Sequence, residues 1–227
     1  YHFMKQKHIF LLKRFLYYIY GEKFYKRLDY NWSHFPSRIE IIKKIINQNN
    51  FKKYLEIGCD KDENFSKIKA ETKVGVDPVR GGTIRSTSDE FFKINKKKFD
   101  IIFLDGLHTY NQTIKDINNS LDHLNSNGVV IVHDCLPKKI WNQIVPRIYG
   151  HWNGDVWKAI VESRTSSNID TYTCVADHGL GVIFKRKNRN LLNLRTNNFK
   201  KLKFSEYYNK HKEFMNPISH QKLFDIF

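Results

Sequence analysis

Two apolar stretches of the chain end in residues that could do chemistry. The run "IIFLDGLH" brings Asp105 and His108 to the end of an apolar segment, and "GVVIVHDC" repeats the arrangement with His133 and Asp134. Imidazoles exchange protons near neutral pH, and carboxylates orient them. Buried carboxylates without partners destabilise a fold, so a set of them at segment ends indicates a binding or catalytic site.

Two earlier segments end in a similar way. "LEIG" contains Glu56 and Gly58, and "VGVD" ends in Asp77, 19 residues after that glycine. A glycine at such a turn lets the backbone approach a ligand, and an acid at the end of the second strand accepts hydrogen bonds from a ribose diol. The loop lacks the fingerprint G-x-G-x-x-G, so we expect an adenosine ligand without phosphates rather than a pyrophosphate.

A parallel sheet would bring these segment ends together. Short apolar runs that alternate with helical patterns predict an α/β fold, with helices on both faces of the sheet. Ligands of such sheets bind beyond the carboxyl ends of the strands. The expected strands are 53–58, 73–77, 100–105 and 128–134, and the expected helices between them are 62–70, 88–95 and 109–125.

The remaining elements close and flank this sheet. A helix is expected over 155–164, followed by a hairpin around His178 and Gly179 that adds an antiparallel element at the sheet edge. Helical periodicity also fits residues 5–29 and 37–49. Ser37 and Glu40 have the spacing of a capping box at the start of the second of these helices. After residue 188 no strand is expected, only a tail that is helical in pieces and peripheral.

The charge lies in the flanks. The formal charge is +16; residues 1–50 carry 10 Lys/Arg against 3 Asp/Glu, residues 185–227 carry 11 against 3, and the middle is close to neutral. We therefore divide the chain into an N-terminal basic helical extension (1–50), an α/β domain (51–187) and a basic C-terminal tail (188–227). The flanks contain no recognisable nucleic-acid-binding motif, so we do not expect a nucleic-acid partner.

The basic, aromatic N-terminal segment has two other interpretations. It could lie on an anionic membrane surface and bring the protein to a site of glycan assembly, or it could form a homodimer. Three widely spaced cysteines favour neither a zinc site nor a disulfide framework. No run of apolar residues is long enough to span a bilayer. We expect a cytoplasmic protein, or one at the inner face of the membrane.

The segments "YLEIGCDKDENFSKI", "VGVDP", "SDEFF", "FDIIFLDGLHTYNQTIKDINNSLDHLNSNGVVIVHDCLP" and "GDVWKA" together resemble the class I S-adenosylmethionine-dependent methyltransferases. The resemblance is to the methyltransferase domain 24 type, which includes sugar O-methyltransferases, and it covers roughly residues 51–186. It implies a Rossmann-like fold with a mostly parallel seven-stranded sheet and a C-terminal antiparallel hairpin. The first loop departs from the family, because acidic and polar residues replace its usual second glycine.

The resemblance also implies roles at the cofactor site. Glu56 and Gly58 would line the methionine side of S-adenosylmethionine, Asp77 would hold the ribose hydroxyls, and Ser88 and Asp89 would lie near the adenine. Asp105 would also face the cofactor.

Some similar O-methyltransferases use a divalent metal, which implies that Asp105 and Asp134 could be its ligands, together with His133. Carboxylates suit Mg²⁺, whereas the histidine would suit Mn²⁺ or another transition metal better. His108 could remove the proton of the acceptor as general base, because its unperturbed pKa is about 6.5. The alternatives are that Asp105 caps the following helix, that His133 contacts substrate, and that Asp134 only orients His133.

Substrate contacts are expected from the segment "HWNGDVWKA", which could fold over the site. Aromatic faces stack on sugar rings, and charged groups bond to hydroxyls or to an anionic group. The alternative for the second tryptophan is packing in the core. The candidates are Tyr110, Trp152, Asp155, Trp157 and Lys158.

Together these features predict an enzyme of polysaccharide biosynthesis. It would be an O-methyltransferase that carries a methyl group from S-adenosylmethionine to a hydroxyl of a sugar or glycoconjugate precursor, with a polysaccharide or a nucleotide-linked sugar as acceptor. The alternative is an RNA methyltransferase or nucleic-acid-binding protein that uses the basic flanks.

Overall fold

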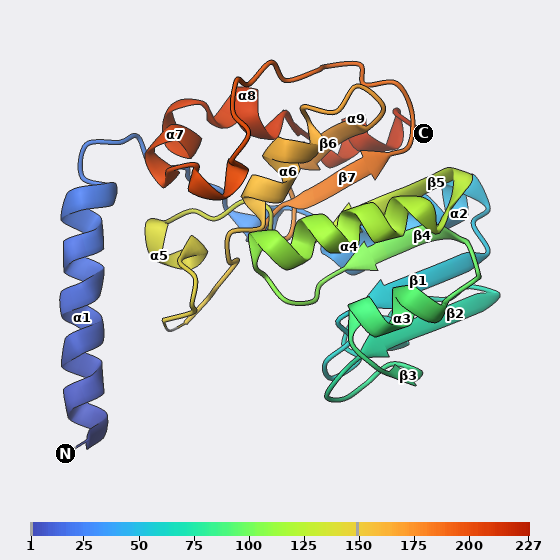
Figure 1. Ribbon diagram of the computed structural model, residues 1–227, viewed down its shortest axis with the longest axis horizontal. Helices are drawn as coiled ribbons and strands as arrows, with labels where there is room; N and C mark the ends of the chain where they lie inside the picture. Colours follow the sequence, from blue (N-terminus) through green and yellow to red (C-terminus); the bar gives the residue numbers. More distant parts are fainter. Residues whose placement is uncertain (1, 149) are drawn as a thin grey trace.

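A single sheet with helices on both faces forms the centre of the computed structural model, which describes residues 2–148 and 150–227 (Figure 1). Within these residues the sheet has eight strands in the order β3-β2-β1-β4-β5-β7-β6-β8. Their bounds are β1 Lys53–Ile57, β2 Thr72–Asp77, β3 Ile84–Arg85, β4 Phe99–Leu104, β5 Leu124–Val132, β6 Asp170–Cys174, β7 Leu180–Phe184 and β8 Pro217–Ile218.

The strand directions confirm the predicted fold class. Strands β3, β2, β1, β4 and β5 are parallel neighbours, and β7 runs antiparallel to both β5 and β6. One strand more is present than the seven expected, because Pro217 and Ile218 pair in parallel with β6. The expectation that no strand follows residue 188 is therefore wrong.

The helices cover the two faces of the sheet as two layers. Helices α3, α4, α6, α7 and α8 pack on one face, and α2 and α9 pack on the other. In Figure 1, α4 crosses in front of β4 and β5, whereas α2 lies behind them. The α-helices are α1 His2–Gly21, α2 Arg38–Asn49, α3 Ser88–Ile94, α4 Tyr110–Asp122, α5 Ile140–Gln143, α6 Trp157–Ser163, α7 Phe204–Asn209, α8 His211–Met215 and α9 His220–Phe224; short 3₁₀ turns lie at Trp32–His34, Phe65–Lys67 and Phe199–Lys201.

Helix α2 begins as its sequence predicts. The Ser37 hydroxyl accepts the backbone N–H of Glu40, and the Glu40 carboxylate accepts the backbone N–H of Ser37, which completes the capping box. Four isoleucines, Ile41, Ile42, Ile45 and Ile46, are buried against the sheet. This packing fixes the start of α2, and with it Arg38, beside the ends of the central strands.

Two predicted helices differ from the structure. Residues 62–70 contain only a 3₁₀ turn, because polar groups bind the loop backbone: the Asp62 carboxylate accepts the N–H of Gly82, and the Lys73 ammonium donates to the carbonyls of Phe65 and Ile68. The helix expected over 5–29 ends at residue 21.

The flanks differ in how they join the body. Helix α1 lies at the left in Figure 1 and contacts the body through α5, and many of the exposed large apolar side chains lie on it, such as those of Leu12 and Phe15. By contrast, Tyr207, Phe214 and Met215 near the C-terminus are fully buried. Among the described residues, no helix is long and apolar enough to cross a membrane. The predicted domain boundaries at 50/51 and 187/188 stay predictions, although both flanks supply core residues.

Candidate active site

A cavity of about 780 Å³ opens beyond the carboxyl ends of β1, β2 and β4. Its size suits a ligand as large as a nucleoside derivative. Five of the six residues predicted to bind the cofactor line it; they are Gly58, Asp77, Ser88, Asp89 and Asp105.

Gly58 makes the turn at the end of β1. Its φ is +88°, and a Cβ at this position would lie 2.3 Å from the carbonyl oxygen of Asp105. Only glycine accommodates both the left-handed backbone and so close an approach. The turn brings the β1 loop against the β4 loop at the mouth of the cavity.

Asp77 is fixed at the end of β2 by backbone donors. Its Oδ1 accepts the N–H groups of Val79 (2.8 Å) and Arg80 (2.9 Å), and its Oδ2 accepts the N–H of Asp60 (3.0 Å). Burial alone would raise the pKa of Asp77, but these hydrogen bonds and the charge of Arg85 lower it. Asp77 therefore presents an ionised carboxylate to the cavity.

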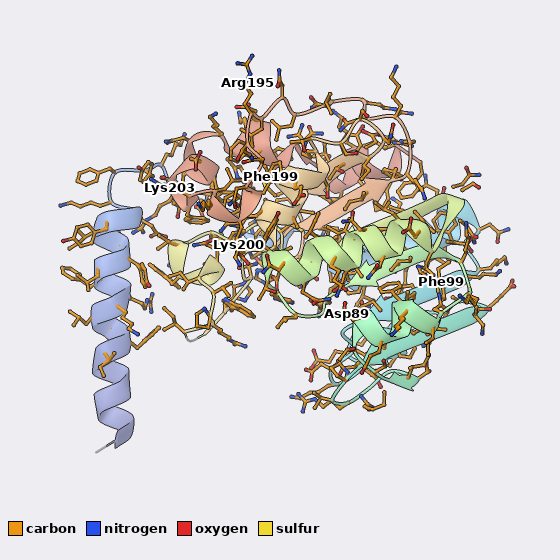
Figure 2. The ribbon with its side chains drawn as sticks, in the orientation of Figure 1. Asp89, Phe99, Arg195, Phe199, Lys200 and Lys203 are labelled. Atoms are coloured by element: carbon orange, nitrogen blue, oxygen red, sulfur yellow. The ribbon has the colours of Figure 1, made fainter. Side chains whose placement is uncertain are left out.

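The far wall of the cavity comes from α3 and α4. Figure 2 shows Asp89 at the start of α3, and its carboxylate accepts from Gln112 (3.0 Å) and Lys115 (2.5 Å) of α4. Gln112 also donates to Ser88 and to Asp116, at 3.2 and 3.0 Å.

Negative charge dominates this cavity. Among the described residues that line it, the aspartates number five, whereas Arg80 is the only cation. Such a lining disfavours a pyrophosphate and favours a ligand that carries positive charge. The aspartates are Asp60, Asp77, Asp89, Asp105 and Asp116.

Glu56 is not among the residues that line this cavity, so its role at the cofactor site stays a prediction. Residues two apart on a strand share a face, so Glu56 points the same way as Tyr54, whose hydroxyl it accepts; it also accepts the Asn64 amide at 2.6 Å. Burial raises the pKa of Glu56 to about 7 against these two hydrogen bonds. Glu56 therefore belongs to a buried polar network with Tyr54 and Asn64.

A second set of side chains meets beside Asp105. His108 lies between two carboxylates: its Nε2 is 3.2 Å from Asp105 Oδ1, and its Nδ1 is 3.2 Å from Asp134 Oδ2. Asp105, His108 and Asp134 form one of two described groups of three that could hold a metal ion. The predicted association of these strand ends is thus present in the structure.

The pKa of His108 is not the ordinary value used in the sequence argument. Burial alone would lower it, but the hydrogen bond to Asp105 and the contact with Asp134 raise it to about 9. The charge of His133 and the hydrogen bond from His108 in turn hold the pKa of the Asp105 carboxyl well below its usual range, against the effect of burial. At neutral pH, His108 is therefore an imidazolium, and it faces the ionised carboxylate of Asp105.

His133 lies beside this group, with its Nδ1 3.7 Å from Asp134 Oδ2, but it belongs to neither of the two described groups of three, so its role as a metal ligand stays a prediction. Its Nδ1 lies 3.0 Å from Asp105 Oδ1, and its Nε2 lies 2.9 Å from the carbonyl oxygen of Asp177. Both ring nitrogens are therefore engaged. Burial opposes protonation, but the charges of Asp105 and Asp134 hold the pKa of His133 well above its usual range.

Two residues that the sequence analysis did not select as site residues complete the cluster. Asp177, in the β6–β7 turn, accepts the backbone N–H of Arg38 at 2.6 Å, and the Arg38 guanidinium lies 3.4 Å from Asp177 Oδ1 and 3.9 Å from Asp105 Oδ2. Arg38 comes from the first turn of α2, far away in the sequence. Of the two, only Asp177 gave a signal in the sequence: it was a weak site candidate at the expected hairpin turn, and an ordinary turn residue was the favoured interpretation.

The segment from His151 to Asp155 folds onto the cluster, as expected. The Trp152 indole stacks on the His108 ring, with centroids 5.6 Å apart and planes 19° from parallel. The Asn153 amide donates to Asp134 at 2.7 Å. Gly154, at φ +63°, lies so close to the His108 carbonyl that a Cβ would overlap it. The loop thereby holds His108 in place.

The other predicted substrate residues lie elsewhere. Trp157 is fully buried against Phe204 and Tyr207, so the prediction that it contacts substrate is wrong. Tyr110, Asp155 and Lys158 line a separate cavity of about 580 Å³. There the Asp155 carboxylate accepts the backbone N–H of Tyr110 and pairs with Lys158, while the Tyr110 hydroxyl donates to Glu162.

A third cavity, of about 390 Å³, is lined in part by Asn153, whose amide donates to Asp134. Its walls include the aromatic rings of Trp32 and Trp141 and the imidazoles of His151 and His178. Arg14, Lys138 and Lys139 add positive charge. Of these residues, only His151 lies in the segment from which substrate contacts were expected, and it was not one of the named candidates.

Comparison with known proteins agrees with this geometry. A family described as "Methyltransferase domain" matches residues 32–135. The fold resembles PaMTH1, a methyltransferase from Podospora anserina solved with SAH bound, at 17% identity over 68% of this chain and 81% of that one, with a TM-score of 0.51. It also resembles cofactor-bound Rv0187 from MTB, at 11% identity over 79% and 90% of the chains, with a TM-score of 0.50. No protein of curated function matches the sequence. The methyltransferase-domain match over residues 32–135 and the order of this sheet support a class I methyltransferase, an enzyme that takes its methyl group from S-adenosylmethionine.

Proposed function

We propose that the protein is an O-methyltransferase that methylates a hydroxyl of a saccharide or glycoconjugate precursor. One observation carries the proposal: Asp105 lines the acid-rich cavity and is also hydrogen-bonded to His108. A donor bound in that cavity and a hydroxyl bound at His108 would therefore lie next to each other. Because the methyl group of a sulfonium is already activated, positioning supplies much of the rate.

The lining of the acid-rich cavity supports S-adenosylmethionine as donor. The sulfonium and ammonium groups of this molecule are positively charged, which matches a wall of five aspartates and one arginine. Asp77 can accept the ribose hydroxyls, since its carboxylate is held ionised at the end of β2. Gly58 lets the chain pass close to the donor.

His108 is the proposed proton acceptor. Its neutral ring would take the proton of the acceptor hydroxyl, and Asp105 and Asp134 would stabilise the imidazolium that forms. Trp152 and Gly154 keep the ring in position. Since the pKa of His108 is about 9, the neutral fraction grows as the pH rises towards that value.

The same three residues also suit a divalent cation. Two carboxylates meet an imidazole whose Nδ1 is buried and makes no hydrogen bond to any described residue, so Asp105, His108 and Asp134 would hold Mg²⁺ or Mn²⁺. When bound, the cation would lower the pKa of the acceptor hydroxyl. Proton and cation compete for His108; we assign the proton, because each ring nitrogen lies 3.2 Å from a carboxylate oxygen.

The aromatic cavity beside Asp134 supports a saccharide acceptor. Trp32 and Trp141 offer flat apolar faces of the kind on which sugar rings stack, and Asn142, Asn153 and His178 offer hydrogen bonds. The cavity lies next to Asp134, which contacts His108.

The test is methyl transfer from labelled S-adenosylmethionine to a panel of nucleotide-linked hexoses and polysaccharides, with RNA as a parallel acceptor. We expect label in methyl ethers of a saccharide and its loss in His108→Gln, with donor binding by calorimetry unchanged in that variant. Label in RNA, or no donor binding by the wild type, would contradict the proposal.

A further inference from the structure

We propose that Asp134, His151 and His178 form a binding site for a divalent transition metal, which adjoins the proton-transfer group at His108 and shares Asp134 with it. One ligand atom from each of these residues lies within 4.8 Å of the others. The two imidazole rings are 4.1 Å apart at their centroids and 32° from parallel. The inference does not depend on the identity of the methyl acceptor.

Separate segments fix the three ligands. Asp134 follows β5 in a left-handed conformation, with φ +60°, and is buried. His178 occupies the β6–β7 turn, also with positive φ (+63°), and its carbonyl accepts the N–H of Leu136 at 2.8 Å. A non-glycine residue in this conformation costs free energy and occurs where the surroundings demand it. The backbone of His178 is thus bonded to Leu136, which lies two residues after Asp134 in the chain.

His151 is held from the other side. Its carbonyl accepts the Asn142 amide at 2.8 Å, and Asn153, two residues later, donates to Asp134 at 2.7 Å. The loop is therefore tied to the carboxylate that would share the metal. Because backbone contacts set both histidine positions, little reorganisation would accompany binding.

The donor set selects the class of metal. Two imidazoles and one carboxylate suit Zn²⁺, Co²⁺, Ni²⁺ or Fe²⁺, whereas Mg²⁺ prefers oxygen ligands throughout. Three protein ligands leave coordination positions open for an outside ligand. His151 and His178 both line the cavity of about 390 Å³, so the open positions would face that cavity and its aromatic walls.

The alternative is an ordinary contact between two histidine rings with no metal. The test uses full-length protein freed of metal with a chelator, then titrated with Zn²⁺ by calorimetry and with Co²⁺ by visible absorption. We expect one equivalent of Zn²⁺ to bind, a visible Co²⁺ band, and much weaker binding of Mg²⁺. His151→Gln and His178→Gln should each weaken Zn²⁺ binding at least about tenfold.

Two controls separate this site from its neighbours. His108→Gln should retain Zn²⁺ binding, whereas Asp134→Asn should lose it; His34→Gln, on the exposed 3₁₀ turn at Trp32–His34, should match the wild type. Circular dichroism confirms that each variant is folded. Unchanged binding in both His151→Gln and His178→Gln would overturn the proposal, and so would loss of binding in His108→Gln, which would place the metal at Asp105 and His108.

Discussion

The two sides of Asp105 are built in different ways. The donor side consists of the ends of β1, β2 and β4, which are parallel neighbours, and its lining is acidic. The proposed acceptor side is rich in histidine and aromatic rings, and its residues come from α1, the 3₁₀ turn at Trp32–His34, the segment from Leu136 to Asn142, the β6–β7 turn and the 150s loop. A sheet edge therefore fixes the part that a common donor requires, while loops supply the part that can vary with the acceptor.

The strongest way to break this division is to change the residue that both sides share. Asp105→Asn should lower turnover about 1000-fold, because His108 loses the carboxylate that stabilises its protonated form. His133 loses a partner as well, so the free energy of unfolding should fall by about 3 kcal/mol. Single-turnover methyl transfer and urea unfolding measure the two effects. A variant with near wild-type turnover would remove Asp105 from the mechanism.

A change confined to the donor side should leave chemistry intact. In Asp77→Asn an amide NH₂ replaces an oxygen that accepts backbone N–H groups, so S-adenosylmethionine should bind about tenfold more weakly. Turnover at saturating donor should stay within about twofold of wild type. Asp122→Asn, whose side chain is 80% exposed, is the matched control. If the variant lost turnover but not affinity, the roles assigned to the two sides would be reversed.

A change confined to the acceptor side should have the smallest effect. Trp152→Leu removes the ring that stacks on His108, and we expect turnover to fall about fivefold with donor affinity unchanged. Trp152→Phe keeps an aromatic face and should recover most of the loss. Steady-state kinetics of both variants measure the difference; equal losses in both would show that stacking is not what matters at this position.

The donor side could be predicted because its pattern is local. A strand followed by a glycine, and the next strand followed by an aspartate, already define Gly58 and Asp77 in the sequence. The exception, Glu56, follows from strand alternation: a residue on the face of Tyr54 bonds to that side chain and is not among those that line the cavity.

The acceptor side could be predicted only in part, because its contacts join distant segments. Asp105 and Asp134 are recognisable at strand ends, but Arg38 and Asp177 meet only when α2 packs beside the β6–β7 turn, 139 residues apart. The different surroundings of His133 and His108 have a local cause. His133 continues the alternation of β5 to the α2 face, where its ring lies near Phe103, while the left-handed backbone of Asp134 turns that carboxylate towards His108.

The central claim is that His108, held between two carboxylates, takes the proton of the acceptor. The most direct test is turnover as a function of pH, at saturating donor and acceptor. Because the base must be neutral and its pKa is raised to about 9, turnover should rise with pH, with its inflection near that value, and His108→Gln should lose the rise. An inflection near the ordinary histidine pKa of about 6.5, or the same profile in His108→Gln, would contradict the claim.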